Sequence, residues 1–474
     1  MKDVGDLGSE KLSRLIFRMS VPAILGMTVN LFYNIVDRIF VGELASEALS
    51  AITMVSPYMT ILSGFAVLVG TGAAALISIK LGEKKPRMAN CILSTSLVLL
   101  FMLSVLIMLP SFFLQEQILK LSGSTETSEL TLRYAKDYLF VIILGVPFQL
   151  ISLGMDQSLR AEGNAKVAMY AMILGAVTNI VLDPIFIFVF SLGTRGAAIA
   201  TVIGQALSGA FILSRYFMRR SHLTLSLRFC RLRYSAKIMT LGMPQFLIQL
   251  ASSVIMLIYN NSLVRYGKIL DPVRGADVAL AAFGIITSVS MVLIMPLNGL
   301  SQGIQPIVGY NYGAKFYMRV KKTFLTAILY ATVWMTVGFL AAELVPHYII
   351  MVFNRKDAEL IRFGAQTLRI VALFLPLVGF QTLSSNYFLA VGKPGASIFL
   401  SVSRQVVLFI PLLLVLPLLL PVQLKIYGVI WASPVADVLS AAIAGVYIFF
   451  EMKRLNRLER KKEVKIRETE ETKC

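Results

Sequence analysis

Two aspartates lie in stretches of the chain that are otherwise apolar. Asp37 lies in NLFYNIVDRIFVG and Asp183 lies in NIVLDPIFIF. An ionisable side chain at membrane depth costs about 2.5–3.5 kcal/mol on insertion scales, so it is usually retained for a function. Each aspartate has a polar residue one helical turn earlier, Tyr33 and Asn179, and this spacing places each pair on one helix face. These four side chains are therefore candidates for a polar site inside a membrane.

The chemistry that such a site can perform is the exchange of one cation for another. Thr201, shortly after the turn TRGAA, is expected to join the pocket. Two carboxylates in one low-dielectric pocket resist simultaneous ionisation, so the pair can take up a proton and release it again. When deprotonated, Asp37 and Asp183 can instead hold a metal cation such as Na⁺, and this competition is the simplest basis of antiport. The alternative is that each aspartate pairs with a nearby arginine, Arg38 or Arg195.

Composition indicates what surrounds these residues. Of 474 residues, 57% are hydrophobic and 15% are charged, whereas a soluble domain carries about 25% charged residues. The net charge of +19 would suggest nucleic acid in a soluble protein, but the basic residues lie between apolar runs and no nucleic-acid-binding motif occurs. The three cysteines are scattered and form no disulfide or zinc pattern. The sequence therefore predicts a polytopic membrane protein without a cofactor and without a nucleic-acid partner.

Apolar runs of about 20 residues predict membrane-spanning helices, and the chain contains about twelve. The predicted fold class is all-α, with twelve transmembrane helices in two pseudo-symmetric six-helix lobes. The expected spans are 15–37, 48–80, 90–114, 136–158, 167–190, 195–217, 237–263, 278–310, 323–345, 361–389, 395–419 and 426–450.

Positive charge predicts the orientation of these spans. With the N-terminus inside, the inner connections hold roughly 30 of the 45 lysines and arginines. They include 84–87, 219–237, 315–322 and 453–465. We therefore expect a multi-pass protein of the cell membrane (plasma or inner membrane), surrounded by lipid, with both termini in the cytoplasm.

The domain organisation follows from the long basic connection near the midpoint of the chain. The expected parts are a cytoplasmic N-terminal segment, a first lobe, a basic cytoplasmic linker, a second lobe and a charged cytoplasmic tail. Their boundaries are 1–14, 15–217, 218–236, 237–452 and 453–474.

The two halves repeat one another with an offset near 231 residues. Gly82 then aligns with Gly313 and Lys84 aligns with Lys315. Two parallel repeats are a common plan among transporters, with the substrate path between the halves. A chance match between apolar sequences is the alternative explanation.

The second half lacks the two aspartates. Tyr259 and Leu412 occupy the positions that align with Asp37 and Asp183. The buried charges of this half are Arg404 and Asp437, which are secondary site candidates. Because unpaired burial is expensive, structural pairing is the main interpretation, and a role in handling substrate or cation is the alternative.

The chain resembles the multidrug and toxic compound extrusion (MATE) family over roughly residues 12–452. The motifs that carry this resemblance are SVPAILGMTVNLFYNIVDRIFVG, GTGAAALISIKLGEKK, NIVLDPIFIF and GIQPIVGYNYGAK. The resemblance implies twelve helices in two lobes that open alternately to each side, and export of cationic, lipophilic drugs in exchange for H⁺ or Na⁺. It also implies a first-lobe cation site at Tyr33, Asp37, Asn179, Asp183 and Thr201. A monomer is expected.

Two further points follow from the resemblance. Pro22 is similar to a helix-one proline linked to bending in such proteins, and a static kink is the alternative. Another branch of the family uses acidic residues on helices seven and ten, whereas this chain carries neutral residues there, so no second-lobe cation site is expected. These residues are Gln245, Gln249, Asn260, Asn261, Gln381 and Asn386.

Three other functions remain as alternatives. A flippase for lipid-linked precursors would need several inward-facing basic residues, and only Arg404 is clearly inside a span. A membrane enzyme would need a cluster of catalytic side chains, but His222 and His347 lie in connections on opposite sides. An ion channel is the third alternative, which stoichiometric exchange would exclude.

Overall fold

The computed structural model describes residues 7–121, 129–218, 220–270, 274–355 and 357–471. The ends of the predicted terminal segments, residues 1–6 and 472–474, and Arg219 of the linker lie outside this part. The described residues form helices and no strand. Eleven helices are long and apolar enough to cross a membrane, and a bent pair raises the number to twelve. The predicted all-α membrane fold is therefore confirmed.

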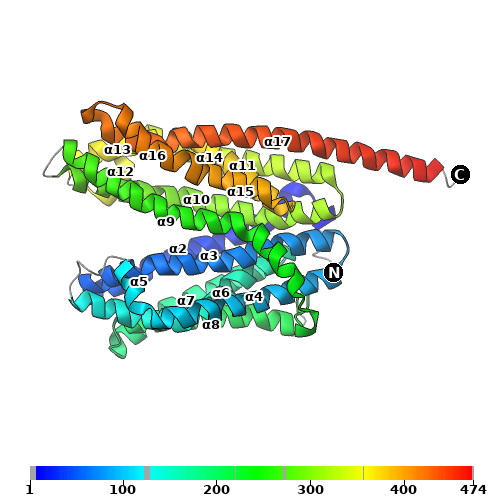
Figure 1. The fold of residues 1–474 in the computed structure, drawn as a ribbon, viewed down its shortest axis with the longest axis horizontal. Coiled ribbons are helices and arrows are strands. Elements are labelled where there is room, and N and C mark those ends of the chain that lie inside the picture. The colour runs from blue at the N-terminus through cyan, green and yellow to red at the C-terminus, as the bar shows by residue number, and fades with distance from the viewer. Residues whose placement is uncertain (1–6, 122–128, 219, 271–273, 356, 472–474) are drawn as a thin grey trace. The chain divides into compact units, whose positions relative to one another are not determined.

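The helices of the first half are close to the predicted spans but longer (Figure 1). The elements are α2 (Leu12–Leu44), α3 (Ser46–Gly82), α4 (Pro86–Phe113), α5 (Gln115–Leu121), α6 (Glu129–Ala161), α7 (Ala165–Pro184), the π-helical turn η2 (Ile185–Val189) and α8 (Thr194–Phe217). Successive long helices run in opposite directions. One end of the bundle, which we call the linker end, therefore contains the start of α2 and the ends of α3, α6 and α8.

The second half follows two short 3-10 turns, and one of its spans is broken. α13 and α14 are together long and apolar enough to cross a membrane, with a bend of 47° between them. The elements are η3 (Leu227–Phe229), η4 (Leu232–Tyr234), α9 (Ser235–Leu270), α10 (Gly275–Gly313), α11 (Tyr317–Leu344), α12 (Pro346–Phe353), α13 (Ala358–Ala372), α14 (Leu375–Ala390), α15 (Pro394–Val402), the π-helical turn η5 (Ser403–Phe409), α16 (Ile410–Leu419), η6 (Val422–Leu424) and α17 (Lys425–Glu471).

The chain forms two compact units. Unit 1 contains 1–249, 305–314 and 389–392, and unit 2 contains the remaining residues. The core of unit 1 is apolar and includes Leu62 of α3 and Ile142 of α6, both shielded from solvent. Burying a polar group without a partner is unfavourable, so polar residues are not expected in such a core. The polar residues that are buried in other parts of unit 1 therefore need an explanation.

Two glycines mark a close helix approach within unit 1. A Cβ atom on Gly82 would lie 1.9 Å from the carbonyl oxygen of Tyr310, and one on Gly313 would lie 2.1 Å from that of Ile79. The residues two positions further on, Lys84 and Lys315, both have a positive φ, of 58° and 61°. The aligned positions of the two repeats therefore share a rare backbone conformation.

Replacing Gly313 by alanine should destabilise the protein. The added methyl group has no space against Ile79, and overpacking of this kind costs about 1–3 kcal/mol. Gly284, on the same helix, has no atom within 4 Å of a Cβ, so Gly284→Ala should be neutral or stabilising by about 0.5–1 kcal/mol. Thermal unfolding of the purified proteins in detergent measures both. Equal melting temperatures for the two variants would contradict the close approach.

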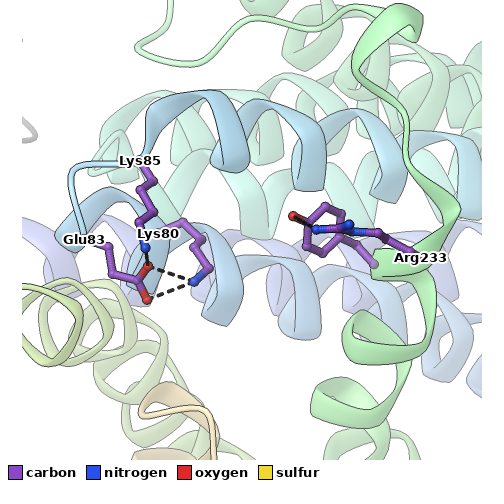
Figure 2. A network of polar contacts seen from close by, with 5 residues as sticks. Lys80, Glu83, Lys85 and Arg233 are labelled. Carbon is purple, nitrogen blue, oxygen red and sulfur yellow. Dashed lines mark hydrogen bonds and ion pairs between the residues drawn. The ribbon is translucent and has the colours of Figure 1, made fainter.

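The linker end of unit 1 is held by polar contacts. Figure 2 shows Lys80 and Lys85 donating to Glu83, with Nζ–Oε2 distances of 2.8 Å for both. Partial burial raises the pKa of Glu83, but the hydrogen bonds and charges of Lys80 and Lys85 outweigh this effect, so the pKa is lowered overall. Arg233, in the linker, lies beside the ring of Tyr234.

The linker itself is anchored to unit 1 through Glu162. This carboxylate is fully buried just beyond α6 and accepts hydrogen bonds from Ser221, from the amide of Leu223 (3.1 Å) and from Asn164 (2.7 Å). Desolvation raises its pKa from 4.5 to about 7, although these donors oppose the rise. Glu162 therefore changes its charge close to neutral pH.

The stability of the protein should depend on pH through Glu162. Because the folded carboxyl group binds its proton more tightly than the unfolded one, stability should fall as pH rises from about 4.5 to about 7 and then level off. Glu162→Gln removes this pH dependence. Relative to wild type, the free energy of unfolding of the variant should therefore rise by on the order of 3 kcal/mol between about pH 4.5 and about pH 7. Melting temperatures at low and at slightly alkaline pH measure it. Glu116→Gln, at an exposed acid on α5, is the control.

Candidate functional site

Unit 1 contains a cavity of about 360 Å³. Most of the residues that line it carry polar side chains, which is unusual for the interior of a helical membrane bundle. The lining residues include Asn30, Tyr33, Asn34, Asp37, Arg38, Ser56, Thr60, Ser63, Tyr138, Gln149, Ser152, Asp156, Met172, Asn179, Thr201, Gln205, Ser208 and Gln249.

The two predicted aspartates meet beside this cavity. Asp37 of α2 and Asp183 of α7 are both buried, and their carboxyl groups lie within hydrogen-bonding reach of one another. Oδ1 of Asp37 and Oδ2 of Asp183 are buried without a hydrogen-bond partner among the described residues. Buried polar atoms normally have partners. A shared proton or a bound cation would supply the missing one.

Two of the predicted companions join the carboxylates. Nδ2 of Asn179 lies 3.2 Å from Oδ1 of Asp183 and 3.2 Å from Oγ1 of Thr201. Asn179 thus bridges α7 and α8, and its contact with Asp183 agrees with the shared helix face that the four-residue spacing predicted. The side chains of Asp183, Asn179 and Thr201 form one buried polar network, whereas their functional role stays a prediction.

The backbone beside Asp183 is irregular. α7 ends at Pro184, and the next five residues form the π-helical turn η2, in which the amide of Phe190 bonds the carbonyl of Ile185 at 2.9 Å. The structure therefore departs from the α-helix directly after the Asp-Pro pair. π turns are often found at functional sites.

Tyr33 and Pro22 both lie on α2. Tyr33 lines the cavity on the same helix face as Asp37. Pro22 is buried within α2, and the helix continues through it from Leu12 to Leu44. The bending role of Pro22 stays a prediction.

The two arginines proposed as alternative partners have other positions. Arg195 lies 3.7 Å from Asp137, on α6. Arg38 lines the cavity beside Asp37. Asp183 is therefore not held by the arginine that follows it along the chain.

Tyr138 and Asp156 are among the residues of the cavity wall that were not singled out from sequence. Tyr138 of α6 faces both Asp37 and Asp183, close enough to interact with their charges. Asp156, near the linker end of α6, forms a buried ion pair with Arg160, with Nε–Oδ2 at 2.9 Å. The i, i+4 spacing of Asp156 and Arg160 was a readable signal, whereas a tyrosine in an apolar run carries none.

Unit 2 has no comparable acid pair at the aligned positions. Tyr259 is buried there and stacks on Phe283 with ring centroids 4.3 Å apart. Leu412 packs against the same apolar cluster. The ion pair expected in this half is confirmed, because Nε and Nη2 of Arg404 lie 2.8 Å and 2.7 Å from Oδ1 of Asp437.

The groups at this site that could hold a cation are oxygen atoms. Among the described residues, no group of three or more His, Cys, Asp or Glu side chains gathers to hold a metal ion. Asp37 and Asp183 supply two carboxylates, and Asn179 adds a buried, unpartnered amide oxygen. These oxygens are hard ligands, which favour H⁺ or a hard cation such as Na⁺ over a transition metal.

A bundle of spanning helices around a buried acid pair and a polar cavity defines a membrane transporter. The MatE family model matches residues 22–185 and 269–415, which is well over half of the chain. The chain therefore belongs to the MatE family. The protein is therefore a membrane transporter and not an enzyme, because MATE proteins are membrane transporters.

Individual relatives agree with this assignment. The multidrug export protein MepA of Staphylococcus saprophyticus is 28% identical over 447 residues, covering 93% of this chain and 94% of the relative. A crystal structure of MATE in the bent conformation matches with a TM-score of 0.88 and 25% identity, covering 96% of this chain and 99% of that one. An outward-facing multidrug resistance MATE family transporter of the MOP superfamily matches with a TM-score of 0.87, 25% identity and the same coverage.

Proposed function

We propose that this protein is a secondary active multidrug exporter that moves cationic, lipophilic compounds out of the cell in exchange for H⁺ or Na⁺. The observation that carries the proposal is the buried pair Asp37–Asp183, in which each carboxylate keeps one oxygen without a hydrogen-bond partner among the described residues. An entering proton or sodium ion fills this position and cancels part of the negative charge. The MepA relatives, which are multidrug export proteins, support the drug class.

The remaining parts of the proposal follow from charge and composition. Both termini face the cytoplasm, because most basic connections lie on that side. No cofactor is required beyond the coupling ion, and the partners are small organic cations and membrane lipid. The lipid-precursor flippase is disfavoured, because among the described residues the cavity wall contains one basic side chain, Arg38. A monomer carries the complete acid pair, since both aspartates come from one chain.

Everted vesicles or proteoliposomes test this function. A pH gradient and, separately, a Na⁺ gradient are imposed while the movement of ethidium is followed. Wild type should move ethidium under one gradient, and that gradient identifies the ion. Asp37→Asn, at equal expression, should lose this movement. Ethidium transport that is unaffected by the substitution would overturn the coupling site, and no transport by wild type under either gradient would overturn the exporter.

A further inference from the structure

Asp156 is the second acid of the cavity, and it lies far from the first. Tyr138, which faces Asp37 and Asp183, precedes Asp156 on α6 by 18 residues, which corresponds to about 27 Å of helix rise. Among the described residues that line the cavity, Asp37 and Asp156 are the two acids. The cavity therefore joins the acid pair to a carboxylate near the linker end.

The Asp156 carboxylate is only partly satisfied. Oδ2 binds Nε of Arg160, but Oδ1 is buried without a hydrogen-bond partner in the described part of the chain. Nη1 of Arg160 also has no hydrogen-bond partner within the part of the chain that the structure describes, while its Nη2 lies 3.0 Å from the sulfur of Met172 on α7. A side chain that served only to balance a buried charge would be expected to satisfy its atoms more completely.

The surroundings of Asp156 favour a chain of hydrogen-bonded water molecules beside its carboxylate. A water molecule needs about 10–15 Å³ of such space, so a cavity of about 360 Å³ has room for many. Gln149, Ser152 and Ser208 line the wall and can hydrogen-bond to water. Besides Arg160, Tyr216 of α8 is a titratable group close to Asp156; its hydroxyl has no partner in the described residues, and it also interacts with Glu162.

We propose that Asp156 is a proton-relay carboxylate between the Asp37–Asp183 pair and the linker end of the cavity. A proton leaves the acid pair for cavity water, and water delivers a proton to Oδ1 of Asp156. The carboxylic acid then releases it to the aqueous phase at the linker end, and Arg160 keeps its charge throughout. The relay rests on the proposed function and specifies it further, because it requires the coupling ion to be H⁺.

Proton release on ethidium binding tests the relay. Binding of ethidium to purified wild-type protein in weak buffer should displace a proton from the acid pair, and stopped-flow mixing with a pH dye records its amplitude and rate. The Asp156→Asn variant should release the same amount of protons as wild type, but at a rate that is lower by at least about 10-fold. Its maximal rate of pH-driven transport in vesicles should fall by the same factor with an unchanged KM for ethidium. Asp156→Glu, which can still carry a proton, should restore both rates.

Matched variants separate the relay from folding and from the coupling site. Asp156→Asn/Arg160→Gln removes both buried charges, so it should fold but remain slow. Recovery of the wild-type rate in this double variant would show that Asp156 only balances Arg160 and would overturn the relay. Wild-type rates in Asp156→Asn, together with an inactive Asp183→Asn, would overturn the relay alone. Activity retained in Asp183→Asn would instead overturn the coupling site.

Discussion

Replacing Asp183 by asparagine should abolish gradient-driven export, lowering the rate by at least about 100-fold. Asparagine has nearly the same shape and can keep the contact with Asn179, 3.2 Å away in the structure. It cannot accept a proton or neutralise a cation at transport pH, so the ion gradient no longer acts on the protein. The vesicle assay with ethidium measures the rate at equal expression.

Two further variants make the Asp183 result specific. Asp183→Glu keeps the charge and should retain part of the activity, reduced because the longer side chain disturbs a fully buried site. Asp137→Asn removes an acid of α6 whose side chain is 38% exposed and lies near Arg195, and it should transport at the wild-type rate. Loss of activity in Asp137→Asn comparable with that in Asp183→Asn would mean that any lost acid impairs the protein, and the argument for coupling would fail.

Breaking the Arg404–Asp437 pair should be the most destabilising single change in unit 2. Arg404→Ala leaves the buried Asp437 carboxylate uncompensated, and such a loss costs about 3–5 kcal/mol. Asp437→Ala should cost less, because the arginine side chain is 27% exposed and can extend its charged group toward water. Thermal unfolding in detergent compares the two variants.

The double variant Arg404→Met/Asp437→Leu distinguishes a structural pair from a working one. Replacing both charges by apolar groups of similar size should recover most of the lost stability. If the pair is structural, the double variant should also export ethidium at close to the wild-type rate. An unstable double variant would contradict the pairing energetics. A stable but inactive one would assign Arg404 and Asp437 a part in transport.

The acid pair was predictable because its signal is local. Asp37 and Asp183 are charges inside apolar runs, and the four-residue spacing to Tyr33 and Asn179 places the companions without knowledge of the fold. Thr201 was found from its position shortly after a turn at the same membrane depth. A sequence therefore predicts best which residues lie together on one helix of about 20 residues.

The features that were not predicted from the sequence have different causes. Glu162 binds the linker 59 residues further on, and nothing in its own neighbourhood indicates that. Asp156 lies close to the predicted end of a span, where charges are common, so its burial was not evident. The break between α13 and α14 was also not predicted, because their combined composition reads as one span.

The π turn after Pro184 gives the segment that follows α7 a way to move by itself. A π turn accommodates one residue more than the α turn it replaces, so expelling that residue would advance the chain beyond it by about 1.5 Å and rotate it by about 100°. Residues from Ile185 to Phe190 would change register while the α-helix that carries Asp183 stayed in place. Opening of the end of this helix that is remote from the linker end would then proceed in discrete steps of one residue, and cysteine cross-links placed along it would switch partners rather than lengthen gradually.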